Sequence, residues 1–111
     1  MNEHQKAVQR LCKKYNVGPV KWRKMKRTWG NCYLGSGEIT LNSQLFEYPV
    51  ICAEHCFLHE LAHATTKQGH TKAFYTKFSL LLMENRISGI RYDKCGYYNE
   101  YKNKVAACEA R

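Results

Sequence analysis

Three histidines and one glutamate lie within twelve positions, between His59 and His70, in a chain that has only five histidines. His59 and His63 are four residues apart, so on a helix their side chains lie on one face, about 6 Å apart. Two imidazoles at this distance can bind one Zn²⁺ ion. Glu60 lies beside them, where it can reach a water molecule without binding the metal. The pattern His-Glu-x-x-His therefore predicts a zinc site with Glu60 as the catalytic base.

A catalytic zinc site needs a third protein ligand and one open position. His70 is the best candidate, because Gly69 can end the helix and adopt the positive φ that turns the chain back toward the metal. Glu84 is the alternative, since some zinc enzymes with this motif use a distant glutamate. We therefore predict one zinc ion per chain, bound by His59, His63 and His70.

Two further residues of the same segment, His55 and Cys56, offer other arrangements. His55 also lies four residues before His59, but Cys56 would then occupy the position of the base, for which it is poorly suited. We expect His55 at the surface or behind the ligands. Cys56 is the side chain that would close a purely structural zinc site. Glu60 would have no task in such a site, so we expect Cys56 to be a small apolar filler.

The chain before this site predicts a helix and a small sheet. Amphipathic spacing indicates a helix over residues 3–15, which the Gly18-Pro19 pair ends. A strand is expected over residues 20–29. A hairpin is expected over residues 31–42, with its turn at residues 35–37.

Two helices are expected next. Pro49 suits a first helical turn, and from there a helix can run to about Lys67. Its face centred on Leu58 should pack on the sheet. The other residues of that face are Ile51, Leu61, Ala62 and Thr65. Thr71 is the predicted N-cap of the following helix. The apolar side of that helix comprises Phe74, Phe78, Leu81 and Leu82.

The 111-residue length fits a single domain spanning residues 1–111. It divides into an N-terminal helix in residues 1–17, a core in residues 18–86 and a tail in residues 87–111. The spacing of four residues in the tail hints at a final helix: Tyr97, Tyr101, Val105 and Cys108. No apolar run could span a membrane, and the N-terminus does not resemble a secretion signal. A cytoplasmic location with reduced cysteines is therefore expected.

The net charge of +9 is high for this length, and eight of the 18 Lys and Arg residues lie between Arg10 and Arg27. Such a basic stretch is either a solvated face or a contact for a polyanion. The candidate nucleic-acid contacts are Lys21, Arg23, Lys24 and Lys26.

An ordered series of features resembles the small YgjP-like and SprT-like zinc metallopeptidases. It comprises a tryptophan-glycine pair, a glycine hairpin, a strand that ends in asparagine, the sequence His-Glu-Leu-x-His, and a later histidine followed by phenylalanine. In this chain the features lie at Trp29-Gly30, residues 35–37, Asn42, residues 59–63, and His70 with Phe74.

The resemblance implies an α+β minimal zincin fold, with a small antiparallel sheet packed on the metal-binding helix and on a backing helix. It also implies that His59, His63 and His70 bind zinc and that Glu60 is the base. A peptide or protein substrate would then lie along an edge strand. The candidate contacts for it are Trp29, Gly30 and Asn31, although Trp29 could equally belong to the core.

The predicted function is therefore hydrolysis of peptide bonds by a zinc-activated water, with Glu60 as general base. Two alternatives stay open. A zinc-dependent hydrolase could act on a nucleotide or another phosphorylated small molecule, which calls for a phosphate-binding loop or a second metal. A non-catalytic zinc module could use its basic half to bind nucleic acid or a protein, which calls for a fourth zinc ligand.

Overall fold

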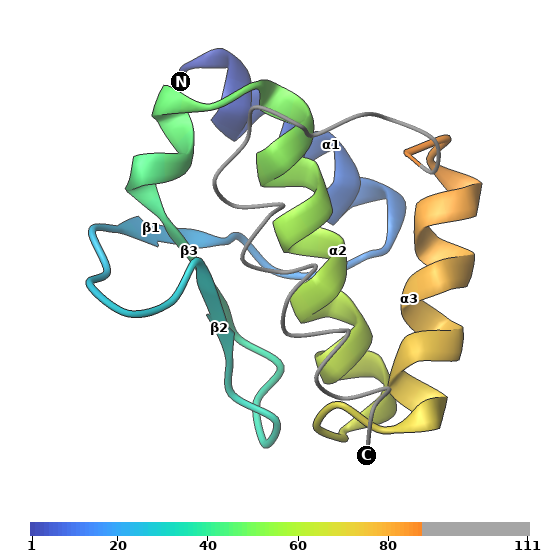
Figure 1. The fold of residues 1–111 in the computed structure, drawn as a ribbon. Coiled ribbons are helices and arrows are strands. Elements are labelled where there is room, and N and C mark those ends of the chain that lie inside the picture. The colour runs from blue at the N-terminus through green and yellow to red at the C-terminus, as the bar shows by residue number, and fades with distance from the viewer. Residues whose placement is uncertain (88–111) are drawn as a thin grey trace.

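The structure, a computed structural model, describes residues 1–87. The helix predicted around Tyr97 and Cys108 lies outside these residues. The described elements are α1 (Glu3–Lys14), β1 (Lys21–Arg23), β2 (Gly30–Cys32), β3 (Ile39–Asn42), the 3₁₀ helix η1 (Ser43–Glu47), α2 (Val50–Thr66) and α3 (Lys72–Glu84). Figure 1 shows α2 in the middle of the molecule, with α3 on one side and the strands on the other. The predicted α+β class is confirmed.

Helix α1 forms where its spacing predicts it. Asn2 caps the helix: its side chain accepts a hydrogen bond from the Gln5 amide, and the Gln5 side chain accepts one from the Asn2 amide. This reciprocal pair satisfies two amides that have no partner inside the helix. Val8, Leu11 and Cys12 are buried, so the predicted apolar face of the helix is confirmed.

The strand predicted over residues 20–29 forms only over Lys21–Arg23, and a loop takes up the rest. The buried side chain of Asn42, 2% exposed, organises this loop. Its amide group donates to the carbonyl oxygens of Met25 and Thr28, and its oxygen accepts from the Met25 amide. These bonds give partners to backbone groups of the loop that have none within an extended strand. The chain therefore curves around Asn42.

The sheet is mixed, whereas the resemblance implied an antiparallel one. The strand order is β1-β3-β2, in which β3 runs antiparallel to β2 and parallel to β1. The cause is topological: the chain reverses twice between β1 and β3, and β3 then inserts between the other two strands. The predicted β2–β3 hairpin is confirmed, and all four residues of β3 are buried because the strand is central.

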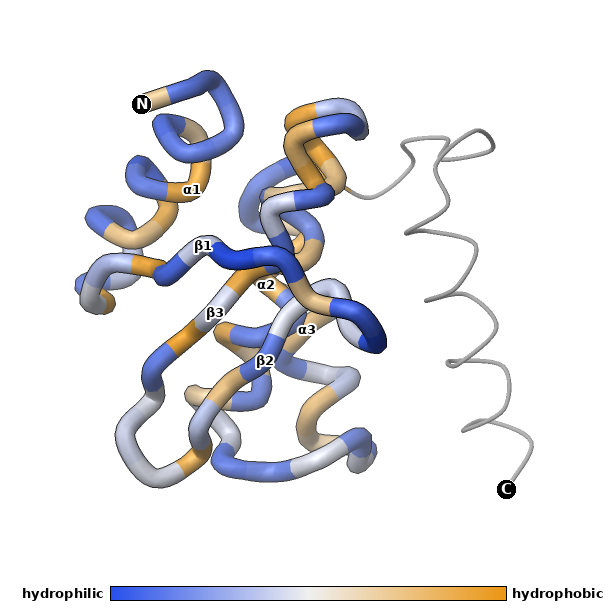
Figure 2. The backbone as a smooth tube through the Cα atoms, turned by 90° about the vertical axis from the view of Figure 1, so that its left-hand side faces the viewer, coloured by the Kyte–Doolittle hydropathy of each residue, from blue (hydrophilic) through white to orange (hydrophobic). Residues whose placement is uncertain are grey.

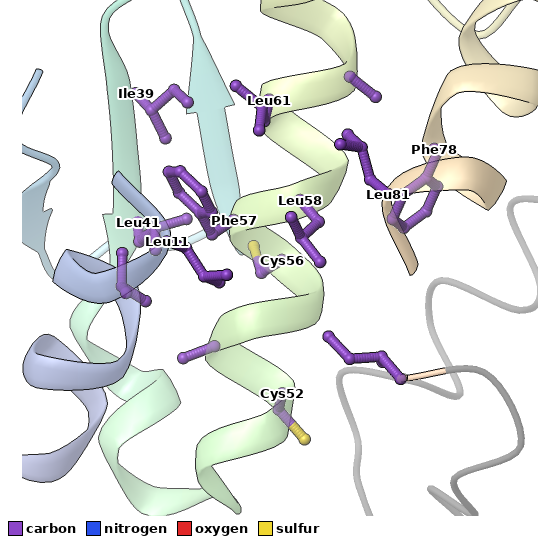
Figure 3. Packing of buried hydrophobic residues seen from close by; sticks show 14 of the residues in the cluster. Leu11, Ile39, Leu41, Cys52, Cys56, Phe57, Leu58, Leu61, Phe78 and Leu81 are labelled. Atoms are coloured by element: carbon purple, nitrogen blue, oxygen red, sulfur yellow. The ribbon is translucent and has the colours of Figure 1, made fainter. Parts of the chain in front are cut away.

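Helix α2 is buried around most of its circumference. It packs against α1, α3, β2, β3 and η1. Phe57 and Leu61 point toward the strands, whereas Leu58 points toward Leu81 of α3 (Figure 3). The prediction that one face of α2 packs on the sheet was therefore incomplete, because other faces of the helix pack on α1 and α3. Thr65, which was assigned to that face, is exposed, because it lies beyond the elements that cover the helix.

Helix α2 ends close to the predicted position, but the turn that follows it lies at Lys67 and not at Gly69. Lys67 caps α2 in the left-handed region at φ 55°, and Gly69 does not have a positive φ. Gly69 therefore does not make the turn. The Thr71 side chain caps α3 by accepting a hydrogen bond from the Phe74 amide, which confirms the predicted start. Phe74, Phe78 and Leu81 are buried, as predicted for this helix.

Among residues 1–87, no helix combines the length and the apolar character needed to cross a bilayer. Within these described residues, no disulfide joins any of the four cysteines Cys12, Cys32, Cys52 and Cys56.

His55 lies in the core and not at the surface, with only 3% of its area exposed. Its ring meets Phe78 edge to face at 5.1 Å between centroids. Burial, with a smaller effect of His59, lowers the pKa of His55 to about 3. His55 is therefore neutral in the folded protein at pH 7.

We expect acidification to destabilise the fold through His55. Its folded-state pKa lies below the value of about 6.5 in the unfolded chain, so the unfolded state takes up the proton first as the pH falls. Between pH 7 and pH 5 this effect should remove about 2 kcal/mol of unfolding free energy. Urea unfolding of wild type and His55→Gln, both with chelator present, measures it. An equal pH dependence in the two proteins would contradict a neutral buried His55.

Candidate metal centre

Three imidazoles converge at the junction of α2 and α3. Each of His59, His63 and His70 offers one nitrogen, and these nitrogens all lie within 4.8 Å of one another. The Nε2 atoms of His59 and His70 face each other at 3.3 Å. The first two histidines are one turn apart on α2, and the third stands immediately before the N-cap of α3. The structure therefore brings together the three side chains that the sequence predicted as ligands.

The spacing and chemistry of these nitrogens fit a zinc ion. Two ligands at 2.0–2.1 Å from a tetrahedral metal are about 3.3 Å apart, which matches the distance between His59 and His70. Neutral imidazole is a donor that zinc accepts readily. Three protein nitrogens leave a fourth coordination position open, as in catalytic sites.

A backbone carbonyl fixes the orientation of His63. Its Nδ1 lies 2.8 Å from the oxygen of Gln68. A carbonyl oxygen can only accept, so Nδ1 carries the proton and the lone pair is on Nε2. Burial is the main influence that lowers the pKa of His63, which keeps the ring neutral at pH 7. Such a bond from the distant ring nitrogen commonly orients a histidine ligand.

Glu60 orients the ring of His59 in the same way. One carboxylate oxygen of Glu60 lies 3.0 Å from Nδ1 of His59, and both side chains are largely buried. The ionised carboxylate can only accept, so the bond places the proton on Nδ1 and the lone pair on Nε2. Glu60 therefore lies at the centre and can also hold a proton there.

The left-handed turn at Lys67 brings the third histidine back to the helix. The Lys67 amide donates to the carbonyl oxygen of His63 at 2.8 Å, which closes the last turn of α2. The chain then reverses, so that the Gln68 carbonyl reaches His63 and His70 reaches His59. The left-handed conformation of Lys67 thus positions the candidate ligand His70 and also the Gln68 carbonyl that orients His63.

Phe74 packs against all three imidazoles of the centre. Its ring stacks on His63 with 4.1 Å between centroids and meets His59 and His70 edge to face at 5.1 and 5.2 Å. Phe74 is fully buried, so it shields from water the side of the imidazoles that it contacts. The sequence predicted Phe74 only as a core residue and as part of the family resemblance. Its position four residues after His70, on a predicted helix, was the signal for this role.

Strand β2 borders the centre at an edge of the sheet. A Cβ atom on Gly30 would lie 2.9 Å from Sγ of Cys56 and 3.1 Å from Cγ of Glu60. Only a glycine lets the strand approach this close to the helix. Gly30, a predicted substrate contact, therefore lies directly against Glu60.

The ladder sets the direction of the β2 backbone. Trp29 and Tyr33 bond to Asn42 and Glu38 across the hairpin. Hydrogen-bonded and non-bonded pairs alternate in an antiparallel ladder, so the amide and carbonyl of Gly30 point away from β3. They lie on the open side of the sheet, where a further strand could bond to them.

The other two predicted substrate contacts lie differently. The Trp29 ring packs edge to face on Tyr48 and against the core, and its carbonyl oxygen accepts from Asn42 and from Cys56. Asn31 is exposed, and its side chain accepts a hydrogen bond from the Cys32 amide.

The rival ligands are not part of the centre. Glu84 lies at the far end of α3, where it accepts a hydrogen bond from the Tyr15 hydroxyl at 2.7 Å. Cys56 turns toward the strands, with its Sγ 3.4 Å from the Trp29 carbonyl oxygen. Neither residue belongs to the group of candidate ligands, and the same holds for His55.

Gln68 is a component of the site that the sequence did not predict. It acts on His63 through its backbone carbonyl, which any residue type supplies, so no sequence signal could identify it. Asn42 was noticed only as a strand end within the family resemblance, whereas the structure shows that it organises a loop.

Comparison with known proteins gives a consistent result. Residues 1–84 match the family described as YgjP-like, metallopeptidase domain. No curated protein matches the chain. The fold is similar to that of the metallopeptidase zymogen abylysin of Pyrococcus abyssi, with a TM-score of 0.55 and 20% identity over 68% of this chain and 76% of that one. It is also similar to the metallopeptidase zymogen jannalysin of Methanocaldococcus jannaschii, with a TM-score of 0.59 and 17% identity over 95% and 99% of the two chains.

We expect the backbone of Lys67, and not its side chain, to determine metal affinity. Lys67→Gly keeps the left-handed turn available and should bind zinc as tightly as wild type. Lys67→Val places a β-branched residue at positive φ and should lower both zinc affinity and stability, the latter by about 1–2 kcal/mol. Competition with a chromophoric chelator measures the affinity. Equal weakening in both variants would show that the lysine amine is what matters.

Gly30→Ala should lower the unfolding free energy by about 1–3 kcal/mol, because the added methyl group overlaps Cys56 and Glu60. Adding Cys56→Ala should restore part of the loss by removing the nearest atom. Gly35→Ala is the matched control, since its Cβ would meet no atom within 4 Å. Urea unfolding measures all of these variants, and a Gly30→Ala protein as stable as the control would contradict the close approach.

Proposed function

The chain belongs to the YgjP-like metallopeptidase family, and from this premise we propose that it is a zinc-dependent peptidase in which Glu60 is the general base. The observation that carries the proposal is the convergence of three imidazoles, two of them oriented by hydrogen bonds, beside a buried carboxylate and an open strand edge. Family membership supports a peptidase, and the local geometry supports the assignment of roles within it.

We assign the metal to His59, His63 and His70. Three imidazole nitrogens favour zinc over magnesium or calcium, which prefer oxygen ligands. A zinc ion in such a site acidifies a water molecule and polarises the carbonyl group of the substrate.

Glu60 is placed to transfer the proton. Its carboxylate is part of the centre and accepts a hydrogen bond from His59, which holds it in one orientation. It would accept a proton from the attacking water and later deliver that proton to the departing amine, so that the carboxylate is unchanged at the end of the cycle. Groups used in this way typically contribute a factor of about 10² to 10⁴ in rate.

Strand β2 is the proposed docking edge for the peptide. A substrate that pairs with the outward backbone groups of Gly30 would extend the sheet by one strand beside Glu60. Asn31 is exposed on the same edge and could contact substrate side chains. Because the ring and carbonyl of Trp29 are engaged with the core, we assign Trp29 to positioning the strand.

The two alternative functions receive less support. In residues 1–87 the three-histidine centre is the one group of candidate metal ligands, so this region offers no carboxylate site for the second metal of a nucleotide hydrolase. A closed structural site would need a fourth ligand, and Cys56 faces away from the centre. The free thiols are compatible with the cytoplasmic location that we propose.

The test separates metal binding from catalysis. Glu60→Gln keeps an oxygen that can accept from His59 but cannot accept a proton as a base. It should retain about one zinc per chain and lose at least about 100-fold in peptide hydrolysis. His70→Ala should lose both the zinc and the activity. Metal content by mass spectrometry and cleavage of an unfolded protein substrate provide the two measurements.

Each contrary result would reject a different part of the proposal. Full activity in Glu60→Gln would remove Glu60 from the mechanism while leaving the metal site intact. Zinc binding unaffected in His70→Ala would show that the third ligand is wrong. A zinc-loaded wild type that cleaves no peptide but releases phosphate from nucleotides would favour the alternative hydrolase.

A further inference from the structure

The first third of the chain has a strongly asymmetric charge. Residues 4–37 contain nine Lys and Arg residues and not one Asp or Glu. The densest part is the segment 23–28, which runs from the end of β1 through the loop that leads to β2. Figure 2, which views the molecule from this side, shows β1 and the following loop as mostly hydrophilic, with a short apolar interruption in the loop. We call residues 23–28 the basic loop.

Four cations of the basic loop lack acidic partners within residues 1–87: Arg23, Lys24, Lys26 and Arg27. All four are exposed. The neighbouring Lys21 differs, because it forms an ion pair with Glu38 at 2.6 Å. Like charges held close together repel one another, so this arrangement weakens the fold unless an anion binds there.

The loop is nevertheless held in one shape. The buried Asn42 side chain binds the backbone of Met25 and Thr28 from inside. Met25, the apolar residue of the loop, is half-buried, whereas the cations point outward. The loop therefore presents its charges outward on a backbone whose shape is fixed from inside.

Aromatic residues flank the basic loop on both sides. Trp22 precedes it and Trp29 follows it. The Trp22 ring lies 4.9 Å from that of Phe46, and the Trp29 ring 5.4 Å from that of Tyr48, so each indole has aromatic support behind it. Both indoles are half-buried and keep part of their surface in solvent. Arginine and lysine for phosphates, combined with aromatic rings for bases, characterise surfaces that bind single-stranded nucleic acid.

We propose that the basic loop, with Trp22 and Trp29 beside it, is a binding site for single-stranded nucleic acid. The phosphates contact Arg23, Lys24, Lys26 and Arg27, and unpaired bases lie against the exposed parts of the indoles. The four cations lie on the connection between β1 and β2, whereas the histidine centre lies on α2 and on the connection to α3 (Figure 1). Trp29 alone adjoins the β2 edge. The binding does not depend on peptidase activity.

The test uses the full-length, zinc-loaded chain and a fluorescein-labelled oligouridylate of 20 nucleotides. The triple variant Lys24→Ala/Lys26→Ala/Arg27→Ala should bind at least tenfold more weakly by fluorescence anisotropy at 100 mM salt. Its slope of log affinity against log salt should be shallower by about 2, as expected for three lost phosphate contacts. The matched control Lys6→Ala/Lys13→Ala/Lys77→Ala removes the same charge from α1 and α3 and should stay within threefold of wild type.

The two tryptophans of the chain both flank the loop, so intrinsic fluorescence reports on the proposed stacking. Oligouridylate or oligothymidylate should quench it, whereas heparin should not. Equal loss of affinity in the two triple variants would overturn the site, because attraction would then depend on net charge alone. Equal binding of a DNA duplex or heparin without quenching would overturn single-strand recognition in favour of a general polyanion contact.

Discussion

The burial of α2 is the constraint on which the rest of the structure depends. This helix is the centre of the core and also carries two of the candidate ligands and the candidate base. Its apolar residues hold α1, α3 and the sheet together. The candidate ligands lie in its C-terminal half, near the β2 edge and the start of α3. The helix that forms the core therefore also fixes the position of the site.

The features that sequence predicted well are those set by local geometry. His59, Glu60 and His63 follow from the 3.6-residue period, and the Thr71 cap and the apolar side of α3 follow from the same regularity. His70 lies beside His59 and His63 as the sequence predicted, but the turn that brings it there differs from the predicted one. Gly69 was assigned the turn because glycine adopts positive φ without strain, yet Lys67 adopts it. The hydrogen bonds of that turn outweigh a local preference of about 1 kcal/mol.

The features that sequence missed depend on contacts between distant residues. The parallel pairing of β1 with β3 depends on which side of the hairpin the first strand joins, and strand composition does not encode that choice. The strand predicted over residues 20–29 is cut short by Asn42, which binds backbone groups of Met25 and Thr28, 17 and 14 residues away. His55 was expected at the surface or behind the ligands, whereas it is buried in the core with its ring against Phe78 of α3.

The placement of the three ligands has a consequence for the rate at which metal would leave. His59 and His63 belong to a buried helix that can move only if the domain unfolds, whereas His70 lies on the short connection between two helices. Local opening of such a connection costs much less than global unfolding. If these histidines hold a metal ion, His70 would be the one that a local opening of the chain displaces most easily. The lifetime of the loaded site would be set by the dynamics of residues 67–71 and not by the stability of the fold.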